Sequence, residues 1–132
     1  MRITADTNVL LRSVLNDDAA QSRLAREILA KATSVFVGST SLCEFAWVLD
    51  RIHKFSRAQV ALAIQNLVNS PRVFVDQPAV DAGLEAMNAG VDFADGVIAY
   101  EGRWLGGETF VSFDEKAVAA LAKQGMKTEL LV

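Results

Sequence analysis

The stretch RITADTNVLLRSVL, residues 2–15, joins a short apolar segment to a helical run through Asp6. Arg2 to Asp6 has the length of a buried strand, and the helix-compatible run from Val9 to Leu15 follows at once. A strand that passes directly into a helix is typical of α/β proteins, because parallel strands need crossover connections. This stretch therefore predicts the fold class and puts a carboxylate at the end of a strand.

The same alternation of strand and helix continues outward through the rest of the chain. The strands are apolar on both faces, as expected where helices cover both sides of a parallel sheet. We therefore predict an α/β fold, a three-layer α/β/α sandwich with a five-stranded parallel sheet, formed by residues 1–132 as a single domain. The further strands are expected at 35–38, 72–76, 109–113 and 127–131, and the further helices near 18–32, 42–52, 56–70, 78–89, 93–105 and 115–123.

Composition narrows the class of protein. Hydrophobic residues make up 52% and charged residues 22% of 132 residues, a globular balance that argues against disorder. The formal net charge of −3 is not that of a dedicated nucleic-acid binder, whose domain is usually basic. A lone cysteine, Cys43, forms no intramolecular disulfide, and no apolar run approaches the ~20 residues that span a bilayer. A cytoplasmic protein is expected.

Four acidic residues lie where predicted strands pass into helices: Asp6, Glu44, Asp95 and Asp114. The functional crevice of an open α/β sheet lies beyond the carboxyl ends of its strands. Carboxylates gathered there repel one another unless a cation lies between them. The pattern therefore predicts a divalent-metal site.

The chemistry that suits such a site is hydrolysis of a phosphodiester bond. Magnesium prefers oxygen ligands, usually one or two carboxylates completed by water and substrate phosphate. We expect Asp6 and Asp95 to bind the metal directly. Glu44 and Asp114 would then act through water or share a second ion.

Each of these acids except Glu44 also has a structural explanation. Asp6 and Asp114 can cap the helices that follow them, and Asp92 can cap the 93–105 helix, whose first turn favours the negative charge of Asp95. Glu44 borders an apolar helix stripe and caps nothing. Asn8 and Ser112 lie near the same strand ends and could orient ligands or water, although both residue types are ordinary in turns. Trp47 and Trp104, where exposed, would serve either a protein interface or stacking on an unpaired base, and the sequence leaves both roles open.

Four motifs together resemble those of PIN-domain ribonucleases, and more narrowly the VapC toxins of prokaryotic toxin–antitoxin pairs. They are DTN at residues 6–8, SLCEF at 41–45, DFAD at 92–95 and FVSFD at 110–114. Each alone is weak, but all four occur in the family's order over the whole length of the chain. The resemblance implies a PIN-like fold and an endoribonuclease that depends on Mg²⁺ or Mn²⁺, with acidic ligands at Asp6, Glu44, Asp95 and Asp114.

The resemblance also implies partners. These are an RNA substrate, a second copy of the chain in a homodimer, and a cognate antitoxin that inserts a segment into the acidic groove, within a larger toxin–antitoxin assembly. The chain departs from the family pattern at Gly96, where alanine is common, and at Tyr100, where a small residue is frequent. Gly96 is expected to loosen the first turn of the 93–105 helix, which would destabilise that turn by up to ~1 kcal/mol relative to alanine.

Other classes of protein remain as alternatives. A dehalogenase-like phosphatase also puts an aspartate after its first strand, but needs a second one where Asn8 stands. A phosphoacceptor receiver domain needs an acidic pair after the first strand, and here Asp6 is alone, although Asp76 and Lys127 lie near the other required positions. A catalytically silent PIN module that only binds a partner is the third alternative.

Overall fold

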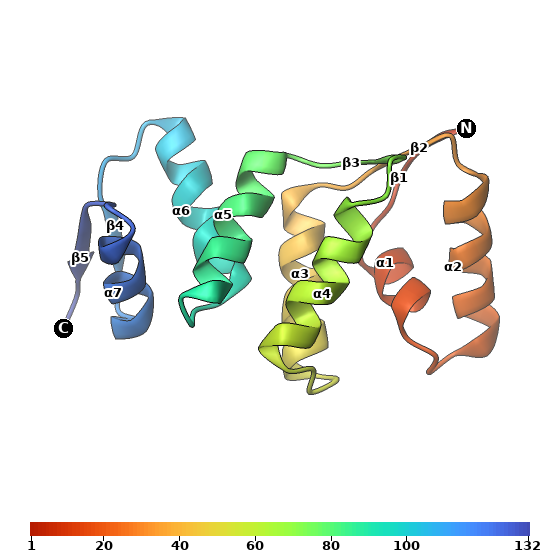
Figure 1. Cartoon of the computed structure of the whole chain (residues 1–132), viewed down its shortest axis with the longest axis horizontal. Coiled ribbons are helices and arrows are strands. Elements are labelled where there is room, and N and C mark those ends of the chain that lie inside the picture. Colours follow the sequence, from red (N-terminus) through yellow and green to blue (C-terminus); the bar gives the residue numbers. More distant parts are fainter. The chain divides into compact units, whose positions relative to one another are not determined.

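The computed structural model describes all residues from 1 to 132, which form two compact units, Met1–Asp76 and Gln77–Val132. Figure 1 labels the elements, and each unit is described by itself. Unit 1 holds β1 (Arg2–Thr4), α1 (Thr7–Val14), α2 (Ala19–Lys31), β2 (Ser34–Phe36), α3 (Ser39–Arg51), α4 (Arg57–Val68) and β3 (Val73–Phe74). Unit 2 holds α5 (Gln77–Asn88), α6 (Phe93–Leu105), β4 (Phe110–Ser112), α7 (Glu115–Lys123) and β5 (Thr128–Leu130).

All strands are parallel, but they form two sheets. In unit 1 the order is β1-β2-β3, with Ile3 opposite Val35 and Val35 opposite Val73. In unit 2, β4 pairs with β5, with Val111 opposite Glu129. The α/β class and the parallel pairing are thus confirmed. The prediction of one five-stranded sheet is wrong, because apolar runs mark buried strands without specifying which strands share a hydrogen-bond ladder.

The core of unit 1 lies where α3 and α4 meet the helices and strands around them. Leu42, Phe45 and Leu49 on α3 are almost fully buried, as are Leu10 on α1 and Ile64 on α4. Their spacing on α3 is the apolar stripe expected of a helix with one buried face. On α2 the buried face is narrower, since Ala25 is buried whereas the neighbouring Leu24 is 62% exposed.

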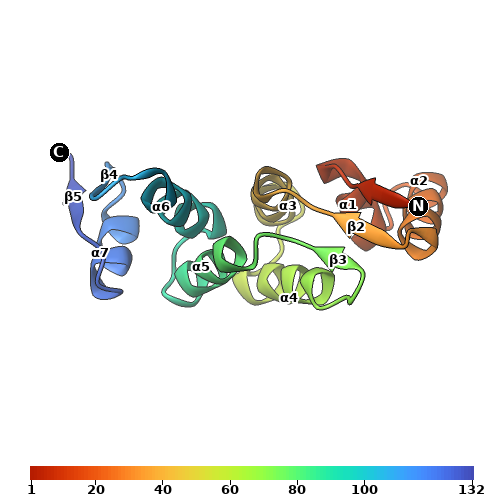
Figure 2. The same cartoon turned by 90° about the horizontal axis from the view of Figure 1, so that it is seen from above.

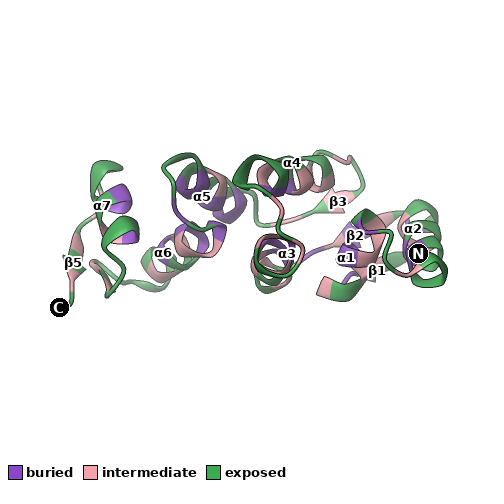
Figure 3. Ribbon diagram, turned by 90° about the horizontal axis from the view of Figure 1, so that it is seen from below, coloured by how far each residue is buried: buried purple, intermediate pink, exposed green.

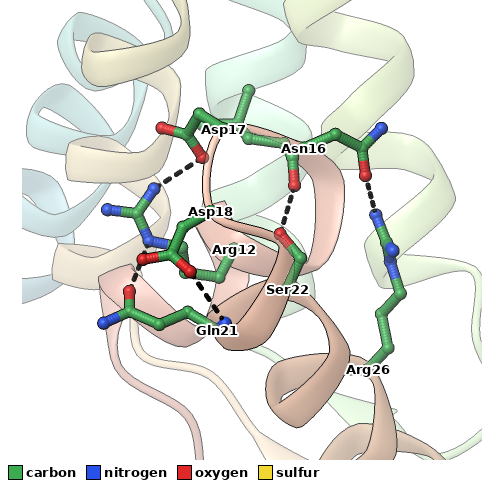
Figure 4. Close-up of polar contacts among 8 residues, drawn as sticks. Arg12, Asn16, Asp17, Asp18, Gln21, Ser22 and Arg26 are labelled. Atoms are coloured by element: carbon green, nitrogen blue, oxygen red, sulfur yellow. Dashed lines mark hydrogen bonds and ion pairs between the residues drawn. The ribbon is translucent and has the colours of Figure 1, made fainter.

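A network of polar contacts ties α1 to α2 (Figure 4). Arg12 on α1 pairs with Asp17 at 2.7 Å and donates to Gln21 on α2 at 2.8 Å, while Arg26 donates to Asn16 at 2.6 Å. The hydrogen bond from Arg12 is the main reason that the pKa of Asp17 is lowered. The network orients α1, whose first residue follows Asp6.

Helix α4 begins with a capping box, for which the sequence has the Ser-x-x-Gln pattern at residues 56–59. The Ser56 hydroxyl accepts from the Gln59 amide at 3.1 Å, and the Gln59 side chain accepts from the Ser56 amide at 2.8 Å. Both bonds satisfy helix N–H groups that have no partner within the helix.

Replacing this cap tests its contribution to stability. Ser56→Ala is expected to lower the free energy of unfolding by about 1 kcal/mol, because one amide of the first turn loses its acceptor. The check is the midpoint of urea denaturation followed by circular dichroism. Ser56→Asp is the matched control, since aspartate caps equally well, and it is expected to stay within experimental error of wild type. Equal loss in both variants would contradict the capping role.

In unit 2 the helices α5 and α6 lie side by side in close contact (Figure 2). A Cβ atom added at Gly96 on α6 would overlap the carbonyl oxygen of Ala82 and lie 2.8 Å from the Cβ of Ala86. A Cβ added at Gly83 on α5 would lie 2.5 Å from the ring of Phe93. Gly96 therefore permits a close approach of two helices, which corrects the expectation that it loosens the first turn.

Burial in unit 2 follows this helix pair. Figure 3 shows buried residues along α5 and α6 and exposed residues on the outside of the pair. A second group of buried residues, Ala86, Val91, Ala117 and Ala120, connects α5 to α7, with Phe110 of β4 packed against it. Gly106 ends α6 at a φ of 115°, a conformation that only glycine adopts without strain, as the predicted helix stop requires. No helix in the chain is both long enough and apolar enough to cross a bilayer.

Candidate metal and phosphodiester site

Asp6 lies directly beyond the carboxyl end of β1. The amide of the preceding residue, Ala5, donates to the carbonyl oxygen of Phe36 in β2 at 3.1 Å. The hydrogen bonding between the two strands therefore continues up to the residue before Asp6. One carboxylate oxygen of Asp6 accepts from the Val9 amide at 3.1 Å and caps α1. The second oxygen has no hydrogen bond, so capping leaves it available as a ligand.

Glu44 is connected to the same junction through Thr7. Thr7 is the first residue of α1, and its hydroxyl donates to Oε1 of Glu44 at 3.1 Å. Glu44 is exposed on α3, next to the buried Phe45. Since Thr7 directly follows Asp6, the structure brings Asp6 and Glu44 to the same end of unit 1. Sequence reasoning missed Thr7, whose only signal was a hydroxyl residue beside the strand-end aspartate.

Asp95 is part of a second acidic group, in unit 2. It lies in the first turn of α6 and is half-buried. Burial is the largest cause of a raised pKa at Asp95, and the negative charges of Asp92 and Asp114 add to it, against a hydrogen bond with the backbone of Asp92 that lowers it. Asp92 and Asp114 therefore both lie near enough to Asp95 for their negative charges to act on it. Asp92 is the N-cap residue of α6, as the capping alternative expected, although its side chain makes no capping hydrogen bond.

Asp114 caps α7, and its own backbone amide is bound by Ser112, the last residue of β4. One oxygen, Oδ1, accepts from the amides of Lys116 at 2.9 Å and Ala117 at 3.1 Å. The Ser112 hydroxyl oxygen accepts from the Asp114 amide at 3.0 Å. As at Asp6, the capping bonds use only one of the two carboxylate oxygens. Ser112 thus positions Asp114, which gives a role to a residue that the sequence left open.

The raised pKa of Asp95 predicts how stability depends on pH. Because the folded chain binds the Asp95 proton more tightly than the unfolded chain, ionisation of Asp95 makes unfolding easier, and stability falls as the pH rises from below 3.8 through the raised pKa. Asp95→Asn should therefore be more stable than wild type at neutral pH in the presence of a chelator. The difference should shrink toward pH 4. Denaturant titrations of both proteins at several pH values measure it, and an Asn variant less stable at neutral pH would contradict it.

The donor chemistry of both groups fits a hard divalent cation. Every candidate ligand is a carboxylate oxygen, which suits Mg²⁺ or Mn²⁺. A cation near Asp95 would favour its charged form, against the burial and the neighbouring negative charges that raise its pKa. Nowhere in the structure do three or more His, Cys, Asp or Glu side chains gather in an arrangement that could hold a metal ion. Asp6 and Glu44 belong to unit 1, whereas Asp92, Asp95 and Asp114 belong to unit 2.

Comparison with known proteins identifies a family model that matches most of the chain. The family model described as "PIN domain" matches residues 3–123, which include both acidic groups. A search of curated proteins gives no match.

Proposed function

The chain belongs to the PIN domain family, a family of metal-dependent nucleases, and on that premise we propose that it is an endoribonuclease. It hydrolyses phosphodiester bonds of RNA with residues 1–132 acting as a single PIN-like domain. The observation that carries the proposal is the presence of two acidic groups: Asp6 at the start of α1 with Glu44 on α3, and Asp95 with Asp92 and Asp114. The family match spans both units, as a single domain requires.

We assign Asp6, Glu44, Asp95 and Asp114 to one catalytic set. Asp6 and Asp95 would hold Mg²⁺ or Mn²⁺ directly, and the ion would supply polarisation of the scissile phosphate and a lower pKa for the attacking water. Asp6 offers the carboxylate oxygen that its cap leaves free. Glu44 orients or deprotonates the attacking water, and its bond with Thr7 holds it in position. Asp114, anchored at one oxygen, directs the other toward water or a second ion.

We further propose the biological role of a toxin of the VapC type, acting in the cytoplasm. Its partners would be an RNA substrate, a second copy of the chain in a homodimer or larger assembly, and an antitoxin that blocks the acidic groups. The support is the resemblance of the four motifs around these acids, together with membership of the family. A small DNA-binding protein encoded beside this chain would support the toxin assignment.

The experiment that tests the nuclease is RNA cleavage by the purified chain, freed of copurifying protein. Single-stranded RNA labelled at one end is incubated with Mg²⁺, with Mn²⁺ and with EDTA. We expect internal fragments with either metal and none with EDTA, because the carboxylates need a cation to approach a phosphate. Cleavage that survives EDTA indicates a contaminant. RNA binding without cleavage would favour a catalytically silent PIN module instead.

A further inference from the structure

Unit 2 contains a pocket that the acidic groups do not use. It has a volume of about 630 Å³, within the range of small-ligand sites, and lies between the α5–α6 pair and the end of α7. The small residues Ala82, Gly96 and Ala99 contribute to it where the two helices touch. The charged and aromatic residues that line it are Asp81, Glu85, Tyr100, Arg103 and Trp104.

The two helices bring opposite charges to this pocket. Asp81 and Glu85 lie one turn apart on α5, and Arg103 lies on α6. Arg103 makes no ion pair with either carboxylate. The carboxylate acceptors of α5 and the guanidinium donors of α6 therefore stay available to a ligand. Asp81 uses one oxygen to accept from Gln77 at 2.9 Å and keeps the other.

Aromatic side chains on α6 complete the pocket. Trp104 is 80% exposed and Tyr100 is partly exposed, one turn apart on the helix. An exposed Trp beside a pocket offers a face on which a planar ring can stack, and base–aromatic stacking is a main source of affinity for unpaired nucleotides. Packing within the unit leaves most of the Trp104 surface uncovered.

We propose that this pocket binds an unpaired guanine of the RNA substrate. Guanine carries two adjacent donors, N1–H and the N2 amino group, which suit the carboxylates of Asp81 and Glu85, and two acceptors, O6 and N7, which suit the Arg103 guanidinium. The other bases lack this combination: adenine has no O6, uracil has a single donor, and cytosine would turn acceptors toward the carboxylates. The base stacks on Trp104. The substrate identity rests on the proposed ribonuclease function, whereas nucleotide binding does not.

Tryptophan fluorescence of the full chain tests the pocket without catalysis. The chain has two tryptophans, so Trp47→Phe leaves Trp104 as the only reporter. In EDTA, GMP is expected to quench Trp104 saturably, with a Kd at least about tenfold lower than those of AMP, CMP and UMP. In the reciprocal variant, Trp104→Phe, the remaining Trp47 should not respond. No saturable quenching by GMP up to about 10 mM overturns the proposal.

Matched variants separate base recognition from general charge effects. Glu85→Gln should abolish the preference for GMP, because an amide cannot accept from both guanine donors. Glu101→Gln, on α6 outside the pocket, removes the same charge and should keep the preference. If GMP quenches both variants as it quenches the parent protein, the pocket does not read guanine. If a tetra-arginine peptide quenches Trp104 and no nucleotide does, the pocket is a protein docking site and the proposal fails.

Cleavage separates failure of the pocket from failure of the nuclease. With Mg²⁺, RNA in which inosine replaces guanine lacks the N2 amino donor, so KM should rise about tenfold with kcat unchanged. Equal kinetics on both RNAs would overturn the pocket and keep the nuclease. GMP binding in a chain that cleaves no RNA would support the pocket and remove the nuclease.

Discussion

Asp6→Asn is expected to abolish metal-dependent RNA cleavage, with a loss of at least about a hundredfold in kcat, the scale of losing one charge-stabilising group in an active site. The amide keeps the shape of the carboxylate and its capping oxygen, so the bond from the Val9 amide persists. It removes the negative charge that a divalent cation requires. The measurement is initial cleavage rate at saturating RNA and Mg²⁺, with circular dichroism as the check on folding.

Asp18→Asn is the matched control for this prediction. Asp18 caps α2 as Asp6 caps α1, with one carboxylate oxygen accepting at 3.1 Å from the amide three residues on, Gln21. The two substitutions thus change equivalent caps in the same unit. We expect Asp18→Asn to cleave RNA at the wild-type rate. Full cleavage by the Asp6 variant would remove Asp6 from the catalytic set, and equal losses in both variants would trace the effect to capping.

Gly96→Ala is expected to lower the free energy of unfolding by about 1–3 kcal/mol, the usual cost of forcing an extra methyl group into close packing. The new methyl group would overlap the Ala82 carbonyl oxygen and press on the Cβ of Ala86, both on α5. A backbone carbonyl cannot move aside as a flexible side chain can, so the helices must separate. Urea denaturation with tryptophan fluorescence, which Trp104 on α6 supplies for this unit, measures the change.

Gly102→Ala on the same helix provides the opposite expectation. A Cβ added at Gly102 meets no atom within 4 Å. Alanine there should raise stability by about 0.5–1 kcal/mol, because glycine gives up more backbone entropy in a helix. Opposite signs for the two glycines would establish close helix approach at Gly96. Stabilisation by both substitutions would contradict it and restore the view that Gly96 only loosens the helix.

The candidate catalytic residues could be proposed from sequence because their local setting has a signature. Asp6 and Asp114 follow strand residues and start helices, and capping geometry depends on only a few neighbouring positions. The contacts of each acid with residues distant in the sequence could not be predicted. The bond between Thr7 and Glu44 joins residues 37 positions apart, and the repulsion of Asp95 by Asp114 connects α6 to the start of α7.

The sequence by itself determined the order of strands and helices, with α6 at 93–105 and α7 at 115–123 as predicted, and the capping box at Ser56. These features depend on hydrophobic period and on side chains within one helical turn, which are local. Only the tertiary structure decided that the strands form sheets of three and two, and that Gly96 lies against α5. Pairing of strands and contact of helices join distant segments, and local periodicity is the same whichever partner a segment finds.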